Sequence, residues 1–296
     1  MASNALSNQA TTRQRRSGLQ ITRVALYVIA GAATLYFLFP LVWLLMASTK
    51  NNSDLYTSSA FWFAHFNLVA NLQQLLTYDN GIYLQWMGNT FLYAFGSASL
   101  SILISALAGY ALAKFTFPGK KLIFNVIVCA VLVPGTVLVL PLYLLMSSVH
   151  LVNTYWSVLL PSLFSAFGIW FSYIYADASI PRELLEAARM DGAGELRIFF
   201  TVGLRLMSPA LATVFLFHFV GVWNSFFLPL MMLSNEHLYP LSVGLYLWNQ
   251  VGTDATYSLT NLMITGSLLA ALPIVLSFVF LQRYWRSGLS LGSIVG

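Results

Sequence analysis

Charged side chains are rare in this chain, and one segment gathers many of them. Residues 181–209, with the sequence PRELLEAARMDGAGELRIFFTVGLRLMSP, place acids and bases inside an otherwise apolar protein. These residues follow no catalytic spacing, and the sequence holds no HExxH, no CxxC and no convincing catalytic triad. We therefore expect that the chain carries no catalytic residues and no metal site, and that it is not itself an enzyme.

The isolated residues that sometimes carry chemistry also favour structural roles. A Gly-Lys pair occurs in KFTFPGKK, residues 114–121, but the first glycine of a phosphate-binding loop is missing. Cys129 is the single cysteine and cannot form an internal disulfide, so we expect a buried, inert thiol. His218 has no second ionisable partner in its apolar stretch, which favours a hydrogen-bonded structural residue over a proton carrier.

The charged segment is predicted to form two short helices around a glycine break. Ser179 and Pro181 suit the start of the first helix as a hydroxyl cap and a first-turn proline. Glu183 and Glu186 suit its positive N-terminal end. Residues 191–194, Asp-Gly-Ala-Gly, then end it, because glycine reaches the left-handed conformation at little cost.

The second predicted helix is amphipathic. Its apolar side is expected to hold Leu196, Phe199, Phe200, Gly203 and Leu204, which recur at helical spacing. Its polar side is expected to hold Arg197, Thr201 and Arg205. The two helices together would make a compact amphipathic projection.

The elements that must position this segment are membrane spans. With 58% hydrophobic and 8% charged residues and a mean hydropathy of +0.76, the composition is that of an integral membrane protein. Backbone groups in lipid must pair internally, so the apolar stretches are expected to be helices, and the fold class all-α. Six stretches are long enough to cross a bilayer: residues 24–46, 90–113, 123–146, 156–176, 209–233 and 261–282.

The basic residues predict the orientation of these spans, because cytoplasmic loops retain Lys and Arg. Lys50 alone falls on one side, and the other thirteen fall on the opposite side: Arg13, Arg15, Arg16, Arg23, Lys114, Lys120, Lys121, Arg182, Arg189, Arg197, Arg205, Arg283 and Arg286. Both termini and the charged segment are therefore expected in the cytoplasm of a multi-pass membrane protein. The net charge of +5 reflects this topology, and nucleic-acid binding is not predicted.

The predicted span cores lack the charges that ion-coupled transport usually needs. Apart from His218, none of the six stretches contains Asp, Glu, Lys, Arg or His. Proton and ion carriers usually bind the coupling ion through buried titratable groups, although sodium carriers can use backbone carbonyls. The sequence therefore favours energy input from a cytoplasmic partner, with an autonomous secondary carrier and a membrane scaffold as alternatives.

Several short motifs occur between roughly residues 89 and 296: Asn89-Thr90, Ala108-Gly109-Tyr110-Ala111, Phe117-Pro118-Gly119-Lys120-Lys121, Glu186-Ala187-Ala188, Asp191-Gly192-Ala193, Phe199, Pro209, Trp223-Asn224, Pro229, Gln282-Arg283, Gly288-Leu289 and residues 292–296. Together they resemble the permeases of ABC importers in bacterial inner membranes, in the carbohydrate-uptake branch that includes the smaller permease of the maltose system. The resemblance implies a type I ABC importer permease fold with a coupling segment at residues 181–205.

In that family the coupling segment docks on an ATPase subunit. By resemblance, the docking residues would be Glu186, Ala187, Ala188, Met190, Asp191, Gly192 and Phe199. The partners implied are a second permease, two ATPase subunits, an extracellular solute-binding protein that meets residues 234–260, and membrane lipid. ATP and Mg²⁺ would bind the ATPase subunits, and this chain would need no cofactor.

The resemblance implies a sugar or oligosaccharide as solute, with a glycerol phosphate or uronate oligosaccharide as the alternative. Trp223 and Asn224 are candidates for the translocation path, because an aromatic face and an amide suit a sugar ring and its hydroxyls. Pro134 and Gly135 are further candidates, since such breaks in a span can line a pathway. A kink accommodated by packing is the equal alternative for these two.

The sequence departs from the family pattern at two places. Residues 203–205, Gly-Leu-Arg, stand where the family usually has a proline, so the second coupling helix is expected to run on toward Pro209. The last residues, 292–296, lack the lysine that often precedes the final glycine. That difference removes support for a contact between this tail and the ATPase subunits.

The predicted organisation has four parts. Residues 1–20 are expected to be a disordered cytoplasmic tail, and residues 21–85 a retained first span with an external loop that holds a small cap or interfacial helix. Residues 86–282 would form the transport domain with five helices and the coupling segment. Residues 283–296 would be a cytoplasmic tail.

Overall fold

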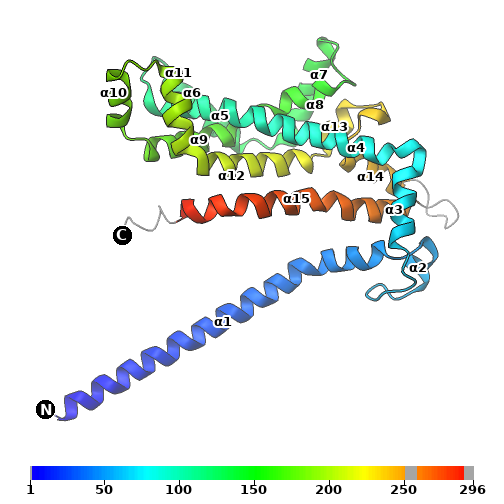
Figure 1. Cartoon of the computed structure of the whole chain (residues 1–296), viewed down its shortest axis with the longest axis horizontal. Coiled ribbons are helices and arrows are strands. Elements are labelled where there is room, and N and C mark those ends of the chain that lie inside the picture. The colour runs from blue at the N-terminus through cyan, green and yellow to red at the C-terminus, as the bar shows by residue number, and fades with distance from the viewer. Residues whose placement is uncertain (1, 251–258, 290–296) are drawn as a thin grey trace. The chain divides into compact units, whose positions relative to one another are not determined.

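The protein is built from helices. The computed structural model describes the backbone of residues 2–250 and 259–289 and the side chains of residues 23–250 and 259–282. Every regular element in these ranges is a helix, which confirms the predicted all-α class (Figure 1). The chain divides into two compact units, Met1–Asn71 and Leu72–Gly296. The expected boundary at residues 85 and 86 falls inside a helix of the second unit.

The first unit consists of α1 (Ala2–Ser48), α2 (Asn52–Thr57) and the first turn of α3 (Leu68–Thr77). The part of α1 in Arg23–Ser48 is apolar enough to cross a membrane, as predicted. Residues 2–20 differ from the expected disordered tail, because α1 begins at Ala2. Extending an existing helix adds one hydrogen bond per residue without a new nucleus, and Ala, Gln and Arg have good helix propensity.

Lys50, the one basic residue predicted outside, is a buried structural residue of this first unit. Its ammonium donates hydrogen bonds to Ser58 Oγ at 3.0 Å and to the Ser59 carbonyl at 2.5 Å. The Asn71 side chain donates to the carbonyls of Ser48 and Lys50. Lys50 therefore stabilises the fold of the loop after the first span. Because it has this structural role, it does not contradict the bias of Lys and Arg toward the opposite side.

The second unit holds the remaining helices. They are α4 (Ile82–Phe91), α5 (Ser97–Lys114), α6 (Lys120–Leu132), α7 (Val139–Ser148), α8 (Tyr155–Ser162), α9 (Ala166–Ser179), α10 (Arg182–Met190), α11 (Glu195–Ile198), α12 (Leu204–Trp223), α13 (Phe227–Met232), α14 (Leu241–Gln250) and α15 (Thr260–Leu289). Short 3₁₀ turns lie at η1 (Tyr78–Gly81), η3 (Gly135–Leu138) and η5 (Glu236–Leu238), and π turns at η2 (Leu92–Gly96) and η4 (Phe199–Gly203).

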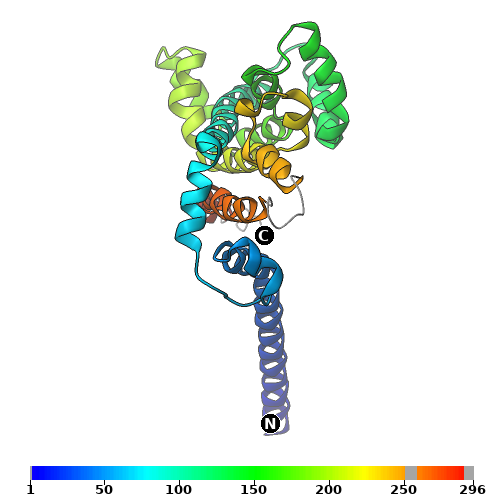
Figure 2. The same ribbon diagram turned by 90° about the vertical axis from the view of Figure 1, so that its right-hand side faces the viewer.

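The apolar helices of the described residues provide five single spans and one bent span. The single spans are Arg23–Ser48, Leu68–Lys114, Tyr155–Ser179, Glu195–Trp223 and Thr260–Gln282, and α6 with η3 and α7 makes the bent one. Within the second unit, α12 packs along α5 and α15 (Figures 1 and 2). Six crossings are therefore available, as the sequence predicted. Residues 251–258 and 290–296 of the predicted external loop and tail lie outside the described residues.

The third span bends by 103° at the predicted break. Val133 is extended and Pro134 follows it, as expected for a residue before proline. Proline has no N–H to continue the helix of α6, so the chain leaves the helix and restarts it in η3 and α7. The predicted kink is confirmed.

The fifth span differs from its predicted range. A continuous helix runs from Glu195 to Trp223, and α13 is a separate short helix. The predicted span began only at residue 209 because Glu195, Arg197 and Arg205 lower the hydropathy before it. Charged residues nevertheless continue a helix readily. The expectation that the second coupling helix runs on to Pro209 is confirmed, and that helix is the beginning of the span.

Small residues allow close helix packing between α5 and α9 in the second unit. A Cβ at Gly109 would lie 2.5 Å from Ser172 Cβ and 2.6 Å from the Tyr173 backbone nitrogen. A Cβ at Gly168 would lie 2.6 Å from Ser105 Oγ. The two helices approach closely through these small residues, and the contact leaves no space for a larger side chain at either glycine.

Candidate functional site

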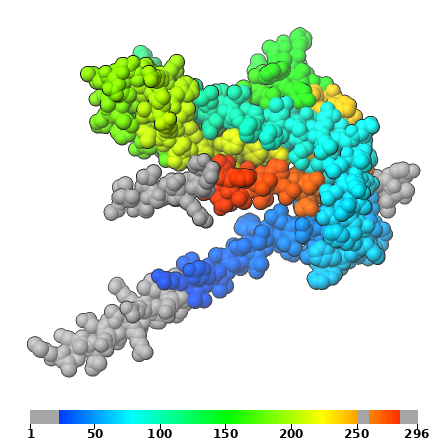
Figure 3. Space-filling view, in the orientation of Figure 1, coloured from blue at the N-terminus to red at the C-terminus, as the bar shows by residue number. Residues whose placement is uncertain are grey.

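The coupling segment, residues 181–205, projects from one end of the second unit as α10 and α11 (yellow-green in Figure 3). Helix α10 begins at Arg182, so Pro181 is its N-cap residue and not the predicted first-turn proline. Glu183 lies in the first turn, as predicted. Ser179 does not cap this helix, because it is the last residue of α9 and its hydroxyl donates to the Tyr175 carbonyl. The predicted hydroxyl cap was wrong, since α9 continues to the residue before Ile180.

The end of α10 is the glycine turn that the sequence predicted. Gly192 has a φ of +78°. Its N–H donates to the Arg189 carbonyl, and the Ala193 N–H donates to the Ala188 carbonyl, both at 3.0 Å. This pair of bonds satisfies carbonyls at the helix end and requires a left-handed residue at position 192.

The outward face of α10 contains most of the predicted docking residues. Glu186, Ala187, Met190, Asp191 and Gly192 are exposed, and Ala188 is half-buried. Met190 is the most exposed large apolar side chain among the described residues. Leu184 on the same helix is also exposed. Exposed apolar side chains beside small ones provide the kind of surface that a groove on a partner binds.

Phe199 was predicted with the docking residues, but it lies in the interior. It packs against the Tyr110 ring, with centroids 5.3 Å apart, in a cluster with Ile180, Leu185 and Ile198. Phe199 thus anchors the coupling segment to α5 and does not present itself to a partner. An aromatic residue is equally suited to a buried position and to a docking surface, so the sequence could not show which position Phe199 takes.

The predicted apolar side of the second helix is only partly correct. Phe199 and Gly203 are buried, whereas Leu196 and Phe200 are exposed and Leu204 is half-buried. Ile198, which was not predicted, is fully buried. Arg197, Thr201 and Arg205 are exposed, as predicted. Apolar residues occupy most of the circumference between 196 and 202, so periodicity could not choose the buried side.

An ion pair that sequence reasoning missed bridges the two arms of the coupling segment. Arg189 Nε donates to Glu195 Oε1 at 2.6 Å, and a second guanidinium nitrogen lies 3.3 Å from Oε2. The hydrogen bond to Glu195 raises the pKa of Arg189 above its ordinary value, so the guanidinium stays charged. Both side chains are substantially exposed, and the bridge therefore orients the turn more than it stabilises the fold.

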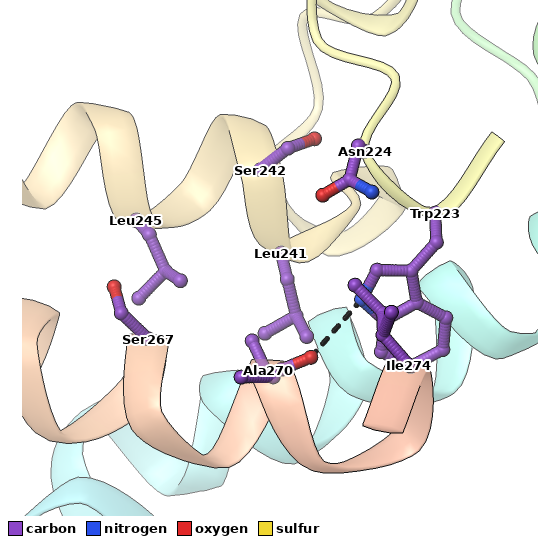
Figure 4. A pocket seen from close by; sticks show the side chains of 9 residues that line it. Trp223, Asn224, Leu241, Ser242, Leu245, Ser267, Ala270 and Ile274 are labelled. Atoms are coloured by element: carbon purple, nitrogen blue, oxygen red, sulfur yellow. Dashed lines mark hydrogen bonds between the residues drawn. The ribbon is translucent and has the colours of Figure 1, made fainter. Parts of the chain in front are cut away.

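At the far end of α12, Trp223 and Asn224 border a cavity of about 230 Å³ (Figure 4). Trp223 is buried and its indole N–H donates to the Ala270 carbonyl of α15 at 3.1 Å. Asn224 is exposed, and its side chain donates to the Val220 carbonyl. The remaining lining residues are Leu241, Ser242, Leu245, Ser267, Ala270, Ala271 and Ile274. The two predicted pathway residues therefore do meet at one cavity.

A more open hollow of about 350 Å³ shares Ser242 and Leu245 with that cavity. It is lined in addition by Phe226, Tyr246, Asn249 and Met263. Most of these residues belong to α14, which sequence reasoning did not connect with Asn224. No local motif marks them, and only the fold of the chain back onto the end of α12 brings them there.

Pro134 and Gly135 do not line either cavity. Both are exposed at the bend of the third span, so the structure does not bring them together with Trp223 and Asn224. Cys129 on α6 is also exposed on the surface of the chain, which corrects the expected buried thiol. It lies on an apolar span, and lipid or another subunit can cover the side that the chain itself leaves open.

His218 is a hydrogen-bonded structural residue, as predicted. Its Nε2 lies 2.7 Å from the Ser162 carbonyl, which joins α12 to the end of α8. No group of three His, Cys, Asp or Glu side chains that could hold a metal ion occurs among the residues the structure describes. The arrangement thus consists of an exposed segment, a long helix and a cavity.

The comparison with known families agrees with this arrangement. Residues 101–290 match the family described as binding-protein-dependent transport system inner membrane component. The chain belongs to this family. It is therefore an inner-membrane transport permease with several spans, and the ATPase of such an importer is a separate subunit. The predicted resemblance to ABC importer permeases is confirmed.

Individual members of this family support the same assignment over nearly the whole chain. The arabinooligosaccharides transport system permease protein AraQ of Bacillus subtilis is 32% identical over 288 residues, which cover 93% of this chain and 97% of that protein. The maltodextrin transport system permease protein MdxG of Bacillus subtilis is 34% identical over 225 residues, which cover 74% and 78%. A solved bacterial ABC transporter that imports alginate has a chain with the same fold, at a TM-score of 0.77 and 23% identity, covering 90% of this chain and 96% of that one.

Proposed function

We propose that this permease is one of two membrane subunits of an ATP-driven importer for a neutral oligosaccharide. The observation that supports it most is that one continuous helix, Glu195–Trp223, starts in the coupling segment and ends at the cavity beside Asn224. At 29 residues it is about 43 Å long, enough to reach from the cytoplasmic surface to the outer part of the bilayer. A displacement of the first turn of this helix therefore also moves its last turn, which lies at the cavity.

The proposed partner at the inner surface is an ATPase subunit. Met190 and Leu184 would enter an apolar groove on it, and Ala187 would allow close approach. Two such subunits, one under each permease, would bind ATP and Mg²⁺. Their closure would move the coupling segment as a body and switch the spans between inward-facing and outward-facing arrangements.

The proposed orientation places both termini and the coupling segment in the cytoplasm. Arg182, Arg197 and Arg205 are exposed at that end of the second unit, where lipid phosphates and cytoplasmic partners would meet them. The opposite end, with η5 and the start of α14, would face the extracellular solute-binding protein. A membrane-impermeant thiol reagent should modify Met190→Cys, in a Cys129→Ser background, only after the cells are permeabilised, and modification in intact cells would contradict this orientation.

A neutral oligosaccharide is the proposed solute. AraQ and MdxG are described as permeases for arabinooligosaccharides and maltodextrin. Neither cavity is lined by Lys or Arg, which a glycerol phosphate or uronate would call for, whereas Asn224, Ser242 and Asn249 offer neutral hydrogen-bonding groups. The second permease would complete the path.

Reconstitution tests this function against the alternatives. The complex is purified from native membranes by a tag on this chain and placed in liposomes with its binding protein. Uptake of a neutral oligosaccharide should require both internal ATP and the binding protein. Uptake by the chain alone, driven by an ion gradient and indifferent to ATP, would instead establish a secondary carrier, and assembly without flux would establish a scaffold.

A further inference from the structure

The coupling segment is joined to the spans at the junction between α9 and α10. The last carbonyls of a helix lack intrahelical partners, and α9 has no basic residue in its last turn to satisfy them. Ile180 after it is extended, and Pro181 has no N–H to offer. This helix end therefore depends on a donor from elsewhere in the fold.

Lys114 supplies that donor from the last residue of α5. Its ammonium lies 2.7 Å from the Ile180 carbonyl oxygen and 3.3 Å from the Asp177 carbonyl oxygen. A cation at the negative end of a helix forms charge-assisted hydrogen bonds, which are stronger than neutral ones. One side chain thus ties the cytoplasmic ends of two spans together at the residue before α10 begins.

The surroundings make this tie a fixed point. Gly109 and Ser172 bring helices α5 and α9 into direct contact. Beyond the tie, Ile180 and Leu185 pack with Tyr110 of α5 in one buried cluster. The coupling segment is therefore held to α5 by apolar packing and by one ammonium group.

We propose that Lys114 is a positioning residue for coupling. It fixes the direction in which α10 leaves α9, so that a push on α10 moves the spans instead of bending the junction at Ile180. This role rests on the proposed function for its consequence in transport. The local geometry can be tested without it.

The test compares three variants in the full chain with Cys129→Ser as background. Lys114→Met keeps an unbranched side chain and removes the ammonium, Lys114→Arg keeps a donor, and Lys120→Met removes a neighbouring ammonium that bonds the Phe115 carbonyl and not α9. Spin labels at Met190→Cys on α10 and Ile174→Cys on α9 report the distance distribution across the junction. This distribution needs neither ATP nor solute.

Lys114→Met should broaden the distribution, with about a tenfold rise in displaced conformations, the order expected for loss of a charge-assisted hydrogen bond. The distance distribution in Lys114→Arg should be narrower than in Lys114→Met. The distribution in Lys120→Met should match that of the chain with Lys114 and Lys120 intact. In the reconstituted importer, Lys114→Met should lower the solute transported per ATP hydrolysed while the subunits still copurify. The proposed positioning role of Lys114 is overturned if the distance distribution is unchanged in Lys114→Met. It is also overturned if Lys120→Met broadens the distribution equally. A broadened distribution with an unchanged transport ratio overturns its role in coupling.

Discussion

Met190 and Phe199, nine residues apart across the Gly192 turn, differ in burial, since Met190 is 88% exposed and Phe199 is 2% exposed. The turn thus separates a surface that is free to bind a partner from an anchor in the interior. Because both belong to one short segment, a force on Met190 reaches the core of the spans through Phe199 and its contact with Tyr110.

Replacing Met190 by Glu should weaken binding of the ATPase subunit. A carboxylate in an apolar groove loses its hydration without gaining a partner, and removal of a central interface anchor typically weakens binding about tenfold or more. The amount of ATPase that copurifies with the tagged permease measures this. Met190→Leu is the matched control and should retain binding, since it keeps the apolar volume. Equal copurification with both variants would exclude Met190 from the interface.

Replacing Gly192 by Ser should destabilise the end of α10. The φ of +78° costs a side-chain-bearing residue about 1–2 kcal/mol. Gly194→Ser is the matched control, because Gly194 has a φ of −72° and stands at the N-cap of α11, where Ser is favourable. Hydrogen exchange of the α10 amides in the purified chain should speed up in Gly192→Ser alone. Similar exchange in both variants would mean that the left-handed turn is not required.

Replacing Gly109 by Ala should lower the thermal stability of the permease. The new methyl group would meet Ser172 and the Tyr173 backbone, and such overpacking costs about 1–3 kcal/mol. In Gly88→Ala the methyl group meets nothing within 4 Å, and the change favours the helix by up to about 1 kcal/mol. Melting temperatures in detergent should therefore move in opposite directions. A shift of the same sign in both would show that α5 and α9 adjust freely.

Replacing Asn224 by Leu should slow uptake by the reconstituted importer. The change removes the amide that borders the cavity at nearly constant volume, so the effect should appear as a weaker apparent affinity for the solute during transport. Asn125→Leu is the control, because Asn125 is exposed on α6 and lines neither cavity. Unchanged uptake in Asn224→Leu would assign the solute contacts to the partner permease.

The sequence predicted the features that depend on local chemistry. The six crossings, the bend at Pro134 and the Gly192 turn follow from hydropathy, proline and glycine, which act within a few residues. Contacts across the chain were not predictable in the same way. Lys114 of α5 bonds the carbonyl of Ile180 at the end of α9, and Ser242 lies beside Asn224 at the cavity. Each pair is more than fifteen positions apart in the chain, and the residues next to Lys114 or Ser242 give no sign of the partner. The buried position of Phe199 was missed because its neighbours are apolar on nearly every side.

The central claim is that the coupling segment is the contact through which an ATPase subunit drives this permease. Its most direct test is disulfide crosslinking in native membranes between Met190→Cys, in a Cys129→Ser background, and cysteines placed around the groove of the ATPase subunit. The account predicts a crosslink to the ATPase subunit that blocks uptake and is reversed by reduction, with none from a cysteine at Tyr246 near the opposite end of α12. ATP-driven uptake that persists with no crosslink at any of these positions would contradict it.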